Sequence, residues 1–208
     1  MELNKKIITT LVIYGIFLLS IVLFLEKAIN FDEYIFFAIN SIESSQLLFF
    51  FNLITYLGSS MFWILLIILF WLKKKKDLSL RLLIVFIIDT IALTILKVIF
   101  FRPRPSQTVI NFFDFDSGFS FPSGHSERAF SGAVILSNYY KKYSLLFYIL
   151  AVLVAFSRIY IGVHYPLDVV IGSVNGIIFS MLVLSIPIKK YKSFFSSQKL
   201  SQLLHYKS

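Results

Sequence analysis

Apolar and polar positions along this chain fall into blocks: long runs of Ile, Leu, Phe and Val are separated by short charged segments. A helix that crosses a membrane needs about 20 mostly apolar residues to span a hydrocarbon core of about 30 Å. By that measure the pattern predicts six membrane-spanning helices, at residues 7–25, 55–72, 79–101, 124–140, 143–161 and 166–187. We therefore expect an all-α, six-helix bundle embedded in a membrane.

Two further segments fit short helices that lie along the membrane surface. Apolar character already begins near Leu47, which would make the second helix about 40 Å long at about 1.5 Å per residue. We therefore expect a break near Gly58-Ser59-Ser60, with residues 47–57 lying partly along the interface. The stretch from Phe31 to Ile42 carries apolar residues at helical spacing and also fits an interfacial helix.

Composition supports a membrane protein and excludes other classes. Hydrophobic residues make up 58% of the chain and charged residues 15%, with no Cys, whereas soluble domains have about 45–50% apolar and about 25% charged residues. This excludes a soluble domain, a disordered tail and a secreted disulfide scaffold. We expect one domain over residues 1–208, with a core at about 55–187 and a basic tail at 189–208.

The net charge of +9 does not indicate nucleic-acid binding, because the basic residues sit at the ends of apolar runs and form no basic stripe. Cytoplasmic segments of membrane proteins are enriched in Lys and Arg. Placing both termini in the cytoplasm puts most basic residues on that side, including the run Lys73 to Lys76. A site facing away from the cytoplasm of a cell membrane is then expected, and six basic residues remain on its side: Lys27, Lys97, Arg102, Arg104, Arg128 and Arg158.

Three segments with chemically active residues share that outer face. They are Lys97 to Pro105, Pro122 to His125, and Ser157 to Asp168. In an up-and-down bundle, the ends of the third and fifth predicted helices and the starts of the fourth and sixth lie at one surface. Residues about 60 positions apart are therefore expected to meet in one pocket.

The residue types in this pocket suit a phosphate group. Lys97, Arg104 and Arg158 supply positive charge, and guanidinium groups match phosphate oxygens in bidentate fashion. Ser123 and Gly124 lie at a predicted helix start, where free backbone N–H groups favour an anion.

Two histidines can act on the phosphate that this cradle would hold. One of His125 and His164 can attack phosphorus as a neutral imidazole, and the other can protonate the departing oxygen. Asp168 follows His164 by four residues and can accept its other ring N–H. The chemistry expected of this set is phosphoryl transfer.

The three segments together resemble the signature of the type 2 phosphatidic acid phosphatase superfamily, which also includes vanadium haloperoxidases. The signature reads Lys-x6-Arg-Pro, Pro-Ser-Gly-His and Ser-Arg-x5-His-x3-Asp. This chain has Lys97-x6-Arg104-Pro105, then Pro122 to His125, then Ser157-Arg158-x5-His164-x3-Asp168. The resemblance covers residues 55–187 and matches every signature position in order.

The resemblance implies a role for each matching residue. His164 is expected to be the nucleophile that forms a phosphohistidine, with Asp168 orienting it, and His125 is expected to be the general acid. The phosphate cradle is expected to consist of Lys97, Arg104, Ser123, Gly124 and Arg158. For a phosphatase of this family, the resemblance implies that no metal ion or other cofactor is needed.

The family implies a lipid phosphate substrate, with membrane lipids around the protein, and leaves its oligomeric state open. A small member with an outward site most resembles enzymes that recycle polyprenyl diphosphates such as undecaprenyl diphosphate. Phosphatidylglycerophosphate, phosphatidic acid and lipid A phosphates are alternatives, as is transfer to a second lipid. Rival classes are a metal-dependent hydrolase using His125, His164 and Asp168 as ligands, and a phosphate or lipid transporter.

Several residues outside the signature have competing interpretations. Arg102 and Arg128 are predicted to hold a second phosphate and so to favour a diphosphate, although binding of lipid headgroups would also explain them. Asp89 suits a hydrogen-bonded packing role, and Glu127 in a first helical turn suits the helix dipole. The Phe-rich loop at 112–121 fits either a lipid entrance or an interfacial aromatic belt.

Overall fold

The computed structural model describes residues 2–105 and 118–187, and over this range every regular element is helical. In chain order the elements are α1 (Glu2–Asn40), α2 (Ser45–Thr55), η1 (Tyr56–Gly58), α3 (Ser60–Leu72), α4 (Lys76–Phe100), α5 (Gly124–Tyr139), η2 (Lys141–Tyr143), α6 (Ser144–Tyr160) and α7 (Pro166–Ser185). The prediction of an all-α fold is confirmed for this part of the chain. The basic tail expected at 189–208 lies outside the described residues.

Three of the described helices are long and apolar enough to cross a membrane. They are α4, the helix formed by η2 and α6 (Lys141–Tyr160), and α7; a fourth span results if the bent pair Ala28–Asn40 and Ser45–Gly58 is counted as one. α3 is apolar but has only 13 residues. The count of six spanning helices therefore stays a prediction.

Helices α4 to α7 begin and end close to the predicted positions, and local sequence explains their ends. α4 stops where Phe101 adopts a left-handed conformation (φ 44°), just before Pro103 and Pro105. α7 starts with Pro166, and the Asp168 carboxylate accepts from the Tyr165 N–H in a capping box.

The break predicted in the second apolar run is confirmed. α2 and η1 end at Gly58, and α3 begins at Ser60. Ser59 between them is extended, and its hydroxyl accepts from the Phe62 N–H over 3.2 Å. A Cβ at position 58 would lie 2.8 Å from the carbonyl oxygen of His125, so this turn packs directly on the start of α5.

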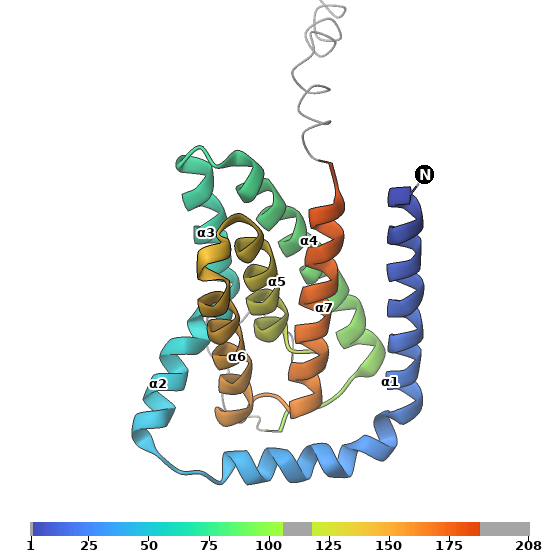
Figure 1. Cartoon of the computed structure of the whole chain (residues 1–208). Helices are drawn as coiled ribbons and strands as arrows, with labels where there is room; N and C mark the ends of the chain where they lie inside the picture. The colour runs from blue at the N-terminus through green and yellow to red at the C-terminus, as the bar shows by residue number, and fades with distance from the viewer. Residues whose placement is uncertain (1, 106–117, 188–208) are drawn as a thin grey trace, which may run out of the picture.

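Both regions, 7–25 and 31–42, are helical as expected, but α1 runs through them as one 39-residue helix, and the interfacial position of the second region stays a prediction. Residues 26–30 contain neither Gly nor Pro, which are the residues that most often interrupt a helix. Figure 1 shows that α1 changes direction instead, and that its second half lies across one end of the bundle. This second half, Ala28–Asn40, is called the crossing segment below.

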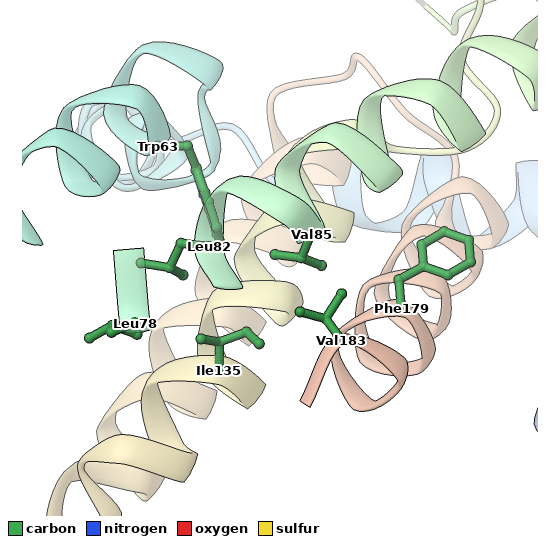
Figure 2. Close-up of a cluster of buried hydrophobic side chains, with 7 residues drawn as sticks. All are labelled: Trp63, Leu78, Leu82, Val85, Ile135, Phe179 and Val183. Carbon is green, nitrogen blue, oxygen red and sulfur yellow. The ribbon is translucent and has the colours of Figure 1, made fainter. Parts of the chain in front are cut away.

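The largest buried apolar cluster lies toward the opposite end of the bundle. It joins α3, α4, α5 and α7 through Trp63, Leu78, Leu82, Val85, Ile135, Phe179 and Val183 (Figure 2). Leu78 lies near the start of α4, and Val183 lies near the end of α7. Close packing of these side chains against one another holds the four helices in register.

α5 is the most polar of the long helices, and it lies between α4, α6 and α7. Its contact with α7 is made backbone to backbone. A side chain at Gly172 would collide with the carbonyl group of Ser123, and one at Gly176 would collide with that of Glu127. The two glycines therefore permit an approach that places the first turns of α5 and α7 side by side.

Candidate active site

The ends of α4 and α6 and the starts of α5 and α7 lie at one end of the bundle, with the crossing segment beneath them in the view of Figure 1. This is the arrangement expected from up-and-down connectivity. The three signature segments are therefore brought to one place, although they are separated by tens of residues in sequence.

The second and third segments are joined directly. The backbone N–H of Ser123 donates to the carbonyl oxygen of Asp168 over 2.9 Å, and the hydroxyl of Ser126 donates to that of Ser123 over 3.0 Å. Ser123, Gly124 and His125 are all buried at the start of α5. The first turn of a helix points free N–H groups outward, so this junction can receive an anion.

His164 and Asp168 form the pair that the sequence predicts. Their Nδ1 and Oδ2 atoms are 3.5 Å apart, and both side chains are fully buried. The backbone N–H of His164 donates to the Arg158 carbonyl over 3.2 Å, which holds the histidine against the end of α6. With Nδ1 facing the carboxylate, Nε2 is the nitrogen that can attack a substrate.

The three signature cations occupy the same end of the bundle. Lys97 is buried and donates through Nζ to the carbonyl of Phe119. Arg158 is buried and donates through Nη1 to the hydroxyl of Thr55 over 2.9 Å. Arg104 is half-buried in the loop after α4. Positive charge held away from water acts strongly on an anion that enters the site.

The segment before α5 is fastened to the end of α4. The N–H of Ser120 donates to the carbonyl of Arg102 over 2.8 Å, and Phe121 packs on Phe100 with ring centroids 4.5 Å apart. These contacts position Ser123, two residues beyond Phe121. Of the Phe-rich loop only Phe119 and Phe121 are described, so both interpretations of that loop stay predictions.

Arg102 and Arg128 are both buried and both engaged within the protein. Arg102 donates to Asp32 and Asp168, and Arg128 donates through Nε to the carbonyl of Gly58 over 2.8 Å. Burial alone would lower the pKa of Arg102, but the carboxylates of Asp168 and Asp32 raise that pKa above its usual value. A second-phosphate role for either arginine stays a prediction, and the contacts of Arg102 indicate a different role.

Asp89 on α4 and Glu127 on α5 are buried inside the bundle. A carboxylate oxygen of Asp89 accepts from the Ser131 hydroxyl over 2.7 Å, which is the hydrogen-bonded packing role expected for it. Glu127 is 1% exposed and lies in the first turn of α5, where the helix dipole favours a carboxylate.

Sequence reasoning missed two residues that contact the signature. Thr55 accepts from Arg158 from the end of α2, and no motif marks it. Asp32 contacts Arg102 from the crossing segment. The sequence around Asp32 gives no clear signal, because Asp32 stands next to a second acidic residue, Glu33.

Comparison with known proteins identifies the family. A family model described as the PAP2 superfamily matches residues 78–192. The chain belongs to the PAP2 superfamily. The type 2 phosphatidic acid phosphatase resemblance is thereby confirmed.

Two relatives of this PAP2 protein carry phosphatase names. It is 34% identical over 126 residues to an undecaprenyl-diphosphatase of Sulfolobus acidocaldarius, covering 57% of this chain and 61% of the relative. It is 34% identical over 146 residues to phosphatidylglycerophosphatase B of Bacillus subtilis, covering 62% of this chain and 70% of the relative. The chain thus spans less than two thirds of the archaeal relative's length.

A solved structure supports the fold over most of the chain. The crystal structure of a transmembrane PAP2 type phosphatidylglycerolphosphate phosphatase from Bacillus subtilis superimposes with a TM-score of 0.73 at 31% identity. The match covers 86% of this chain and 96% of that one. Together with the apolar helices, this likeness indicates a multi-pass membrane protein.

Thr55 gives a direct test of the cation cluster. Replacing Thr55 by Val removes the acceptor for Arg158 and changes the side-chain shape little. Without this contact the guanidinium of Arg158 is less well positioned, and its own hydrogen bond to an anion is worth about 1.5–3 kcal/mol, so we expect orthovanadate to bind about tenfold more weakly. Isothermal titration calorimetry in detergent measures this affinity. Thr55→Ser keeps the hydroxyl and should bind vanadate with the affinity of the wild type. Equal affinity of the Thr55→Val and wild-type proteins would contradict a role for Thr55 in positioning Arg158.

Proposed function

We propose that this PAP2 superfamily protein is a membrane lipid phosphatase that hydrolyses a lipid phosphate or diphosphate, with a polyprenyl diphosphate such as undecaprenyl diphosphate as its preferred substrate. One observation carries this proposal: the three signature segments meet at one end of the bundle, where α4 and α6 end and α5 and α7 begin. The names of the archaeal and bacterial relatives support the substrate class.

The proposed reaction uses the signature residues in sequence. Lys97, Arg104 and Arg158, with the backbone at Ser123 and Gly124, hold the terminal phosphate. Nε2 of His164 attacks phosphorus, and the bond from phosphorus to the leaving oxygen breaks as His125 protonates that oxygen. Water then attacks phosphorus as His125 takes one of its protons, the bond from phosphorus to His164 breaks, and inorganic phosphate departs, which restores both imidazoles. For a diphosphate, the leaving group is the lipid monophosphate.

An apolar cavity supports the proposal that the substrate is a lipid. It has a volume of about 280 Å³ and lies between α3, α5 and α6. Along α5 it extends from Ala129, one turn beyond His125, to Leu136, and its lining includes Leu57, Phe62, Trp63, Gly132, Tyr140 and Val154. Part of an acyl or prenyl chain would fit this lining while the phosphate occupies the site next to it.

The diphosphate preference rests on the name of the archaeal relative and on Arg128, since the guanidinium of Arg102 already pairs with two carboxylates. Arg128 lies one turn after His125 on α5, close to the proposed cradle. We therefore propose Arg128 as the residue nearest to the phosphate that stays on the lipid.

A substrate panel tests the function. The purified protein is given farnesyl phosphate, farnesyl diphosphate, undecaprenyl diphosphate, phosphatidylglycerophosphate and phosphatidic acid, and released phosphate is measured. We expect release to be fastest from the diphosphates, to be blocked by vanadate, and to disappear in His164→Ala.

The same assay separates the rival classes. Loss of activity in EDTA would favour a metal-dependent hydrolase, and no release from any lipid would favour a transporter. Phosphate that appears on an added acceptor lipid instead of in solution would indicate a phosphotransferase. Metal independence itself stays a prediction until EDTA is tested.

We further propose that the site faces away from the cytoplasm of a cell membrane and that both termini are cytoplasmic. In Figure 1 the N-terminus, the Lys-rich turn before α4 and the turn before α6 lie at the end opposite the site. Those turns carry Lys73 to Lys76, Lys141 and Lys142, as the positive-inside rule favours for a cytoplasmic side.

Cysteine labelling tests this orientation against a clean background, because the chain has no Cys. Gly118 is exposed, and a Cβ there meets no atom of the described residues within 4 Å, so Gly118→Cys should be tolerated. We expect an impermeant maleimide to label Gly118→Cys in intact cells and to label Lys142→Cys only after the cells are opened. The reverse pattern would overturn the proposed orientation.

A further inference from the structure

A chain of buried charges links the crossing segment to the proposed catalytic pair. Nη2 of Arg102 lies 2.6 Å from Oδ2 of Asp32, and Nη1 lies 2.8 Å from Oδ1 of Asp168. The three side chains are 9% exposed or less. The guanidinium also lies 4.1 Å from the ring centroid of Tyr165. Arg102 is therefore fixed by three partners, and two of them lie next to His164.

Asp32 also caps α7. Its Oδ1 accepts from the backbone N–H of Leu167 over 2.8 Å, in the first turn of the helix that carries Asp168. Asp168 itself accepts from the N–H of Tyr165 over 2.9 Å. One carboxylate from the crossing segment thus fixes both the backbone of this turn and the guanidinium that holds Asp168.

The sum of the charges gives Asp32 a second effect. A guanidinium in contact with Asp168 offsets the negative charge that this carboxylate presents to His164. Arg102 and Asp168 alone would form a neutral pair, whereas Asp32, Arg102 and Asp168 together carry a net charge of about −1 when both carboxylates are ionised. His164 gains positive charge as it attacks phosphorus, so a net negative group beside it stabilises that step.

We propose that Asp32 is a positioning residue of the enzyme, which acts through Arg102 to fix the carboxylate of Asp168 and to keep its negative charge effective at His164. The inference rests on the proposed phosphatase function. It assigns a role to a residue outside the 78–192 range that the family model matches, and it replaces the predicted second-phosphate role of Arg102.

Asp32→Asn tests the proposal with little change in shape. The amide oxygen can still accept from the Leu167 N–H, but the negative charge is lost. Small misplacement of a catalytic group can cost about 100-fold in rate, so we expect kcat to fall by about 10- to 100-fold. KM should change by less than about threefold, since Asp32 does not touch the proposed phosphate cradle. The loss should be equal on farnesyl phosphate and farnesyl diphosphate.

Asp32→Glu separates a charge effect from a packing effect. Glutamate keeps the charge but is longer, so it fits the buried position less well than asparagine. We expect Asp32→Glu to retain a higher kcat than Asp32→Asn. If Asp32 were merely structural, the order would be the opposite.

Two further variants test whether Asp32 acts on kcat through Arg102. Asn40→Ala removes another contact of the crossing segment, the hydrogen bond from Asn40 to the Tyr160 carbonyl at 3.0 Å, without touching Arg102. We expect this variant to keep kcat within about threefold of the wild type. In an Arg102→Met background, Asp32→Asn should lower kcat by less than about threefold further, because its route to Asp168 is already broken.

The outcomes separate this inference from the function on which it rests. Wild-type kcat in Asp32→Asn, an equal fall in Asn40→Ala, or additive losses with Arg102→Met would overturn the positioning role and leave the phosphatase function intact. Loss confined to the diphosphate would return Arg102 to the second-phosphate role and also overturn the proposal. Absence of phosphate release by the wild type would overturn the function and the inference together.

Discussion

The direct contact between the backbones of α5 and α7 is the constraint on which the rest of the site depends. Gly172 and Gly176 allow it, and the hydrogen bond from Ser123 to the carbonyl of Asp168 fixes its register at the site end. This junction places the start of α5, with His125, beside the turn that carries His164. A larger side chain at either glycine would separate two of the three signature segments.

The close approach also explains how a polar helix can lie within a membrane protein. α5 carries buried Ser, His, Glu and Arg side chains that would be costly to expose to lipid. Its neighbours supply partners instead: the Gly58 carbonyl accepts from Arg128, and Asp89 accepts from Ser131. Apolar helices α4, α6 and α7 surround it. The protein thus places its charged groups in the interior and at the two ends of the bundle, while large hydrophobic side chains cover the exposed faces of its helices.

Local patterns in the sequence predict much of this fold. The end of α4 follows from Phe101 before two prolines, and the start of α7 follows from Pro166. The break before α3 follows from Gly58 and the two serines after it. The signature positions predicted at one end of the bundle are indeed brought to that end, because helix order alone places them there.

Local sequence patterns do not predict the contacts between segments that are distant in sequence. The position of the crossing segment against the bundle follows from packing of buried Phe36 on Ala155, Ile159 and Val169, which no local pattern reveals. The partners of Arg102 lie 66 and 70 residues away, so its pairing with Asp168 and Asp32 follows from tertiary structure. The sequence predicts that Arg102 holds a second phosphate, but in the folded protein its guanidinium pairs with the carboxylates of Asp32 and Asp168.

The central claim is that His164 forms a covalent bond to phosphorus, and trapping that bond tests it most directly. The purified protein is mixed briefly with a lipid diphosphate labelled in its terminal phosphate, quenched in alkali and digested, and the labelled peptide is sequenced by mass spectrometry. The account predicts an acid-labile, alkali-stable phosphate on His164, which is absent from His164→Ala and still forms in Asn40→Ala. Label on another residue, or turnover with no trapped phosphate at any quench time, would contradict it.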